Sequence, residues 1–314
     1  MVDSVAGLVT VGRFAPTPSG RMHLGNVFAA LLAWLSVRSR GGEMVLRMED
    51  LDKARTSAEY AETLRRDLGW LSLDYDRETP AQSTRKNAYD RAFRQLEELG
   101  LVYPCYCTRS QLHSVNAPHL SDGTYVYPGT CRNLTDGERA RFARPPAWRV
   151  RVDDRQWVVQ DRVQGEYRCV LSRDCGDMVI RRADGVYVYQ LAVTVDDGEA
   201  GVTEVVRGMD LLSSAPRQMY LQTLLGLPHP EYAHVPMLLA ADGRRLSKRD
   251  KDLDLGELQK HLKPEQLMGW LSHAAGLIDR PEPVSPRELT KEFSWEKIRG
   301  DHIFADTQAL LNMG

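Results

Sequence analysis

The 314-residue sequence predicts an α/β protein whose parallel sheet is built from two halves separated by an inserted module. An apolar run at residues 8–11 precedes a Pro/Gly-rich loop, and a second apolar run at 27–35 follows it, which predicts a strand, a loop and a helix. Residues 43–48 alternate as a second strand should. Two further β-forming runs, 186–195 and 201–210, come much later. The first of these is apolar enough to be a strand buried on both faces.

Helices connect and follow these strands. Apolar residues recur at helical spacing in several segments, while Gly and Pro mark their ends. The segments with this pattern are 57–71, 84–99, 214–225, 247–262 and 264–276. The C-terminal 65 residues or so therefore predict a short helical region. An apolar strand is expected at 235–240.

Composition limits the classes of protein that fit. Hydrophobic residues make up 42% and charged residues 27%, which is ordinary for a soluble chain with roughly two domains. The net charge of −2 gives no overall electrostatic case for nucleic acid. Between Arg132 and Arg182, however, twelve arginines face eight acidic residues and no lysine. That segment is a candidate RNA-facing surface, or alternatively a solvated arginine-rich face.

No apolar stretch approaches the ~20 residues that a membrane-spanning helix needs, and the N-terminus lacks the pattern of a signal peptide. We therefore expect a cytoplasmic protein with no membrane partner. In that compartment the five cysteines are better interpreted as thiols or metal ligands.

The loop at residues 13–26 carries the strongest functional signal. Pro16 and Pro18 fix two φ angles, whereas Ser19 and Gly20 allow the chain to turn. Backbone N–H groups and His23 would converge at a helix N-terminus, where the helix dipole favours an anion such as a nucleotide phosphate. The alternative is an ordinary Pro/Gly-rich loop with one hydrogen-bonded histidine.

The whole string resembles the first signature of class I glutamyl-tRNA synthetases, whose loop usually ends in the motif HIGH. Here Leu24 replaces Ile, and Asn26 replaces the second His while keeping a neutral donor. The resemblance implies a Rossmann-type catalytic domain. It implies that ATP is bound by His23, Gly25 and Asn26. It further implies a glutamate site that includes Arg13, Phe14, Ala15, Pro16 and Thr17.

Three later blocks extend this resemblance in the same order. The string RMEDLD places Glu49 where the family binds the amino group of its substrate. Tyr189 and Arg207 match positions that line the family's glutamate pocket, although an unaligned Tyr is more often a core residue. A buried Arg requires an anionic partner, so Arg207 is less easily explained as core. Which of Arg13 and Arg207 takes the side-chain carboxylate stays open.

The basic loop at residues 243–249 resembles the mobile KMSKS loop of the same enzymes. Arg245 stands at the first Lys, Lys248 matches the second, and Arg249 replaces the final Ser. By itself such a loop is usually a solvated turn. In this context Lys248 would stabilise the departing pyrophosphate and act with His23 as the catalytic pair. Magnesium is expected with ATP, although no motif forms a protein cage for it.

Cys105, Cys107 and Cys131 lie close together in the sequence and suggest a tetrahedral zinc site. Coordination chemistry alone favours a histidine, His113 or His119, as the fourth ligand; three reduced thiols without a metal are the alternative. The arrangement CxC followed by YxxxC resembles the zinc site of glutamyl-queuosine tRNA(Asp) synthetases, short paralogues of glutamyl-tRNA synthetase. That resemblance implies Tyr127 as the fourth ligand of a structural Zn²⁺.

The resulting domain prediction has four parts. Residues 1–102 form the first half of the catalytic domain and 103–177 the inserted module, which resembles an acceptor-binding domain and holds the zinc site. Residues 178–250 form the second half with the KMSKS-like loop. Residues 251–314 form the short helical region, with no anticodon-binding domain.

The resemblance implies a ligase that activates L-glutamate with ATP and transfers it to queuosine at the wobble position of tRNA(Asp). We expect a monomer. One alternative is a compact glutamyl-tRNA synthetase that charges the acceptor end of tRNA. Another is an inactive paralogue that binds an amino acid or RNA. The joint presence of His23, Glu49, Arg207 and Lys248 argues against the inactive paralogue.

Overall fold

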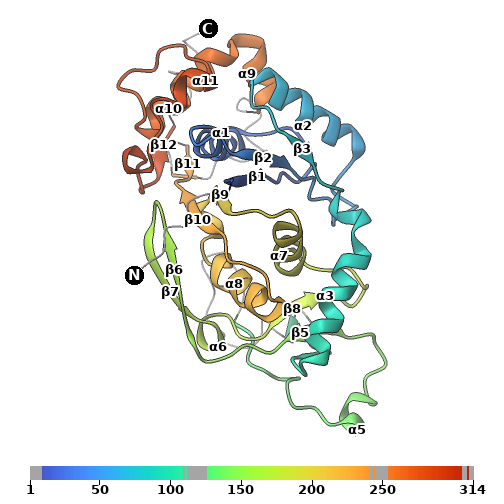
Figure 1. The fold of residues 1–314 in the computed structure, drawn as a ribbon. Helices are drawn as coiled ribbons and strands as arrows, with labels where there is room; N and C mark the ends of the chain where they lie inside the picture. The colour runs from blue at the N-terminus through green and yellow to red at the C-terminus, as the bar shows by residue number, and fades with distance from the viewer. Residues whose placement is uncertain are drawn as a thin grey trace.

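The protein is described here by a computed structural model that covers residues 9–108, 110–111, 126–240, 243–244, 254–305 and 310. A seven-stranded sheet runs through its middle in the order β3-β2-β1-β9-β10-β6-β7 (Figure 1). Its strands are β1 (Val11–Phe14), β2 (Glu43–Leu46), β3 (Arg77–Glu78), β6 (Gln156–Asp161), β7 (Gly165–Val170), β9 (Glu204–Gly208) and β10 (Glu231–Val235). All neighbours pair in parallel except β6 and β7, which form an antiparallel hairpin. The predicted α/β fold with a mostly parallel sheet is confirmed.

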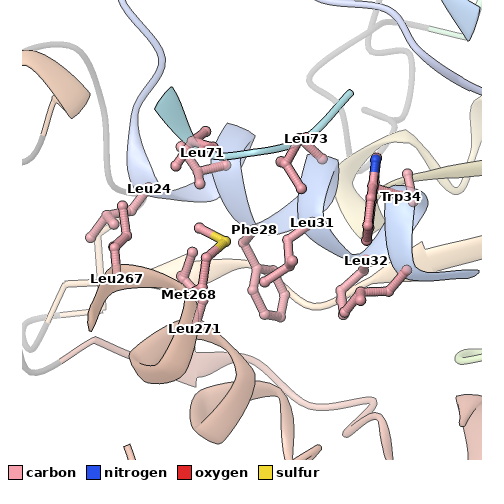
Figure 2. Packing of buried hydrophobic residues seen from close by; sticks show 14 of the residues in the cluster. Leu24, Phe28, Leu31, Leu32, Trp34, Leu71, Leu73, Leu267, Met268 and Leu271 are labelled. Carbon is pink, nitrogen blue, oxygen red and sulfur yellow. The ribbon is translucent and has the colours of Figure 1, made fainter. Parts of the chain in front are cut away.

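Helix α1 (Leu24–Arg38) is the centre of the largest buried cluster. It is apolar on nearly every side, because the sheet covers one side of it and other helices cover the rest. Figure 2 shows Phe28 and its neighbours on α1 beside Leu71 and Leu73, with Met268 of α10 (Pro264–Ala275) packed from below. The C-terminal helices are therefore part of the core that holds the start of α1 in place.

The expected helices at 57–71, 84–99, 214–225 and 264–276 are confirmed as α2 (Ala58–Trp70), α3 (Lys86–Glu98), α8 (Ser214–Leu225) and α10. Of the helix expected at 247–262, the structure describes α9 (Leu255–His261). The remaining short elements are α11 (Pro286–Leu289), β12 (Ile303–Phe304) and the 3₁₀ turns Gln82–Thr84, Met209–Leu211 and Trp295–Lys297. Within the described part of the chain, none of the helices combines the length and apolar composition that a bilayer crossing requires.

Two expectations about strands were wrong. Most of the run at 186–195 belongs to helix α7 (Tyr189–Glu199), not to a strand. Its β-forming residues adopt the helical period because Leu191, Ala192 and Val195 then pack in one cluster with α8. The strand expected at 235–240 is split into the end of β10 and β11 (Leu238–Leu239), which pairs with β12 instead.

The middle of the chain contributes to two sheets. Strands β4 (Val102–Cys105), β5 (Ala147–Val150) and β8 (Met178–Arg181) form a separate antiparallel sheet, accompanied by the short helices α5 (Asp136–Arg139) and α6 (Leu171–Asp174). The β6–β7 hairpin lies between β5 and β8 in sequence, yet it extends the seven-stranded sheet at β10. The predicted module therefore interlocks with the main sheet.

Candidate active site

A cleft of about 750 Å³ opens where three strands of the main sheet end. Phe14 ends β1, Gly208 ends β9 and Val235 ends β10, and all three residues line the cleft. The strands are parallel neighbours, so their carboxyl ends meet at one edge, which is where α/β sheets bind ligands.

The cleft brings together every predicted amino-acid-binding and nucleotide-binding residue that the structure describes. These residues are Arg13, Phe14, Ala15, Pro16, Thr17, His23, Gly25, Asn26, Glu49, Tyr189 and Arg207. Lys248, Arg245 and Arg249 lie outside the described residues, so the predicted role of the basic loop stays a prediction. The lining also includes Asp210 and Arg55, which sequence reasoning did not select.

Helix α1 begins at this cleft. His23 is its N-cap, in an extended conformation, and its backbone N–H donates to Asn26 Oδ1 at 3.3 Å. Asn26, which replaces the second histidine of the family motif, therefore closes the first turn of the helix. A Cβ atom at Gly25 would lie 3.1 Å from the His23 ring, so glycine lets that ring lie close to the helix.

The loop before α1 is held by backbone hydrogen bonds to the segment after β2. The N–H of Arg47 donates to Phe14 O and that of Glu49 donates to Pro16 O, each at 3.0 Å. The N–H of Ser57 donates to Pro18 O at 3.1 Å. These bonds fix the loop against the residues that carry the charges of the site.

Arg47 lies at the centre of a buried ion-pair network. Its side chain is 0% exposed, and its Nη1 lies 2.5 Å from Asp197 Oδ1 while its Nη2 lies 3.1 Å from Glu49 Oε1. Arg13 adds a longer contact of 3.6 Å from its Nε to the same Asp197 oxygen. Asp196 is a third buried carboxylate near Arg47, at 3.9 Å from its Nε, and it pairs more closely with Arg85 at 2.6 Å. The cations and carboxylates of the network compensate one another, as buried charges must.

Two carboxylates of this network, those of Asp197 and Glu49, differ in their acidity. Burial alone would raise the pKa of Asp197, but Arg47 and Arg13 hold that pKa below its ordinary value. For Glu49 burial dominates, and its pKa stays raised although Arg47 and Arg13 oppose the shift. The Glu49 carboxylate would therefore gain from one more cation in the cleft.

Arg207 is a buried cation with a different environment. It is 5% exposed and its Nε donates to His234 Nε2 at 3.0 Å, while Nη1 donates to Gln218 Oε1 at 2.8 Å and to the Tyr189 hydroxyl at 3.4 Å. Nη2 donates to the Leu211 carbonyl at 3.3 Å. These partners are neutral, and no ion pair of Arg207 is found among the described residues. Burial raises the pKa of Tyr189, so its hydroxyl stays protonated.

Sequence reasoning missed Arg47, Asp197 and His234. Arg47 precedes Glu49 by two residues, so an alternating strand end carries both side chains to the same side. Asp197 lies between the two β-forming runs at 186–195 and 201–210, and it belongs to helix α7, which the sequence analysis did not predict. Nothing in the local sequence of His234 distinguishes it from a core residue.

The three thiols come together in the inserted module. The sulfur atoms of Cys105, Cys107 and Cys131 all lie within 4.8 Å of one another. The Tyr127 hydroxyl lies 3.5 Å from Cys105 Sγ and 3.9 Å from Cys107 Sγ. Tetrahedral zinc with sulfur ligands places its donors about 3.8 Å apart. The donor set thus fits the metal, although His113 and His119 lie outside the described residues.

The surroundings of the cluster differ at each thiol. Burial would raise the pKa of Cys105, but the Arg149 guanidinium, which stacks 3.6 Å from the centre of the Tyr127 ring, holds it below its ordinary value. Burial and the neighbouring thiols raise the pKa of Cys107 to about 12. Such a thiol ionises at neutral pH only if a cation joins the cluster.

The arginine-rich segment is largely neutralised within the protein. Seven of its twelve arginines make ion pairs with nearby carboxylates: Arg132, Arg139, Arg155, Arg162, Arg168, Arg173 and Arg182. The pairing is what a solvated arginine-rich face shows, so an RNA-facing surface there stays a prediction.

The chain matches the family model of the catalytic domain of class I tRNA synthetases (E and Q) over residues 9–269. It is 45% identical to the glutamyl-Q tRNA(Asp) synthetase of Symbiobacterium thermophilum, covering 96% of this chain and 98% of that protein. It is 47% identical to the protein of the same name from Nocardia farcinica, covering 90% of this chain and 88% of that one.

Two crystal structures share the fold. One is the glutamate-tRNA synthetase of Elizabethkingia anophelis, with a TM-score of 0.83 and 26% identity over 96% of this chain and 69% of that chain. The other is a glutamate tRNA ligase of Elizabethkingia meningosepticum in complex with its amino acid, with a TM-score of 0.81 and 27% identity over 96% and 68%. This chain therefore belongs to the class I tRNA synthetases (E and Q), and it is a ligase of the glutamyl-Q tRNA(Asp) synthetase family.

Proposed function

We propose that the protein activates L-glutamate with ATP and transfers the glutamyl group to queuosine at the wobble position of tRNA(Asp). The names of its relatives support this substrate pair. The observation that carries the amino-acid part is Arg207, a buried cation in the cleft that neutral partners surround. A buried guanidinium gains most from an anionic ligand, and the glutamate carboxylate supplies one.

Selection of glutamate follows from the charges on the two sides of the cleft. Arg207 and Arg13 would bind carboxylate, while Glu49 would bind the α-ammonium with Tyr189 and Thr17 closing the pocket. Glutamine presents a neutral amide in place of the side-chain carboxylate. Binding it would leave a buried cation uncompensated, so the site should reject glutamine.

Activation requires positioning more than proton transfer. The α-carboxylate of glutamate, already ionised at neutral pH, attacks the α-phosphorus of ATP. A bond forms between the carboxylate oxygen and the α-phosphorus, the bond from that phosphorus to the oxygen of the β-phosphate breaks, and pyrophosphate leaves. ATP is expected to bind together with Mg²⁺. His23 and the N-terminus of α1 would hold the phosphates, with Gly25 and Asn26 beside them. Lys248 would stabilise the departing charge.

Transfer then consumes the adenylate. The acceptor group of the modified base attacks the glutamyl carbonyl carbon and forms a bond to it, the bond from that carbon to the phosphate oxygen breaks, AMP leaves, and the proton of the acceptor group passes to solvent. We assign the thiol cluster a structural role: Cys105, Cys107, Tyr127 and Cys131 would hold one Zn²⁺ and tie the loops of the inserted module together. Metal analysis of the purified protein should find about one zinc per chain, and protein without metal would defeat the assignment.

The acceptor is tested with labelled glutamate, ATP and three RNAs. These are tRNA(Asp) with queuosine, tRNA(Asp) without it, and tRNA(Glu). We expect label only on the queuosine-containing tRNA(Asp). Label on tRNA(Glu) alone would instead make the protein a compact glutamyl-tRNA synthetase, the activity named for its structural neighbours. Label on none of them, with no adenylate formed, would favour an inactive binding protein.

A further inference from the structure

Behind Arg207 lies a chain of buried polar groups that the proposed reaction does not use directly. His234 is 0% exposed, and its two ring nitrogens have different partners. Nε2 lies 3.0 Å from the Nε of Arg207, and Nδ1 lies 2.5 Å from Asp161 Oδ2. The three side chains therefore form a line from Asp161 through His234 to the wall of the cleft.

The sheet explains how this line is assembled. Arg207 on β9 and His234 on β10 are register partners, and Tyr232 of β10 pairs with Asp161 at the end of β6. Asp161 Oδ1 accepts the backbone N–H groups of Val163 and Gln164 at 3.0 and 2.9 Å, which fixes the turn of the hairpin. The backbone of the hairpin turn therefore holds one oxygen of the Asp161 carboxylate, while the other oxygen contacts His234.

The partners of His234 require one tautomer. The Nε of Arg207 can only donate, so Nε2 of His234 must accept and carry no proton. The proton then lies on Nδ1, where the Asp161 carboxylate accepts it. The imidazole is neutral in this arrangement. A protonated ring would direct a second donor at Arg207 and add a like charge beside it.

We propose that Asp161 and His234 are positioning residues that orient the Arg207 guanidinium and thereby set the preference for glutamate over glutamine. The inference rests on the proposed role of Arg207 in binding the glutamate carboxylate. By taking the Nε–H, His234 directs one edge of the guanidinium into the sheet. A ligand in the cleft then meets the Nη groups, and one N–H of Nη2 has no acceptor among the described residues.

The other contacts of Arg207 fit this role. Gln218, Tyr189 and Leu211 accept from the Nη groups, and with His234 they account for four of the five N–H donors within the described part of the chain. The 3.4 Å contact with Tyr189 is long and could yield a second donor to a carboxylate. Burial, opposed by Asp161 and aided by Arg207, lowers the pKa of His234 to about 4, which keeps the ring neutral.

Three variants test the inference. His234→Gln keeps an acceptor near the position of Nε2, whereas His234→Met removes it at similar size. Asp161→Asn keeps the Oδ1 contacts but turns an amide N–H toward Nδ1. That change forces the proton of His234 onto Nε2, where it faces another donor. His234→Gln is the matched control for both of the others.

Calorimetry at pH 7.5 would give Kd values for glutamate, glutamine and ATP with each full-length variant. We expect His234→Met and Asp161→Asn to weaken glutamate binding about tenfold and to lower the glutamate-to-glutamine preference by a similar factor. His234→Gln should stay within about threefold of the unmodified protein. The Kd for ATP should not change in any variant.

Arg207→Gln separates the two levels of the proposal. If it leaves glutamate binding unchanged, the role of Arg207 is wrong and the inference is overturned with it. If it weakens glutamate binding while His234→Met and Asp161→Asn keep the normal preference, only the inference is overturned. Urea unfolding identifies any variant that fails to fold. Should His234→Met fail, the comparison of Asp161→Asn with His234→Gln decides.

Discussion

Arg47 and Arg207 are both buried, and they lie on either side of strand β1, yet their surroundings are opposite. Arg47 contacts two carboxylates directly, at 2.5 and 3.1 Å. Arg207 donates to an imidazole, an amide, a hydroxyl and a carbonyl. The first cation is paired within the protein, whereas the second has only neutral hydrogen-bond partners among the described residues, which is why we propose that it binds an anionic ligand. Burial of an arginine therefore does not reveal its role until its partners are known.

The largest expected effect is on stability, at Arg47. Arg47→Met removes the cation between Asp197 and Glu49, so Glu49 loses its ion-pair partner and Asp197 keeps only the longer contact with Arg13. The free energy of unfolding should fall by about 3–5 kcal/mol. Urea unfolding followed by circular dichroism measures it. A loss below about 1 kcal/mol would mean that the network is not structural, and the contrast with Arg207 would disappear.

The next effect is a pH dependence of the free energy of unfolding, caused by His234, the imidazole partner of Arg207. The pKa of His234 is about 4 in the folded protein and ordinarily 6.5, so between these values the unfolded chain binds a proton that the folded chain does not. Stability from this group is present above pH 6.5 and is lost as the pH falls toward 4, by about 3 kcal/mol in total. Unfolding free energies across this range should therefore fall more steeply for the unmodified protein than for His234→Gln. Parallel curves would contradict the prediction.

Arg207→Met is the matched counterpart of Arg47→Met. It removes the desolvation cost of a buried charge but leaves its four acceptors without their donor, so the free energy of unfolding should fall by about 1–2 kcal/mol, less than for Arg47→Met. Its Kd for glutamate should rise about a hundredfold, because a charge-assisted pair with the ligand is lost. Calorimetry and urea unfolding on the same sample test both. If this variant unfolds as readily as Arg47→Met, the two arginines do not differ as described.

The smallest expected effect is at Glu49, which takes part in the Arg47 ion-pair network and also faces the cleft that Arg207 lines. Since burial already raises its pKa, Glu49→Gln should change stability little. Loss of the carboxylate for the ammonium should weaken glutamate binding about tenfold. Unchanged glutamate affinity would remove Glu49 from the pocket.

Much of the fold follows from local patterns. Helical spacing correctly predicted α2, α3, α8 and α10. In α3 the buried residues Ala88, Ala92 and Leu96 lie on one face, as the spacing requires, whereas α8 is buried on most of its sides. The run that forms α7 was predicted to be a strand, since its valines and tyrosine favour that conformation by themselves. Packing against α8 and the ion pairs of Asp197 with Arg47 and Arg13 outweigh that preference.

The sequence predicted those residues of the candidate site that belong to short motifs. The loop around His23 and the residues Glu49, Tyr189 and Arg207 do line one cleft. What the sequence could not indicate are contacts between distant segments. Asp161 and His234 lie 73 positions apart, and only the pairing of β6 with β10 brings them together.

The hairpin that carries Asp161 also has a consequence for building chimaeric proteins. Exchanging residues 103–177 with the equivalent stretch of a relative would replace two strands of the main sheet, β6 and β7, along with the thiol cluster. Crossover points that leave β6 and β7 with their host, and exchange only the segments on either side, would preserve the contacts from Asp161 through His234 to Arg207. A segment that the sequence presents as a separate insertion therefore contributes two strands to the main sheet.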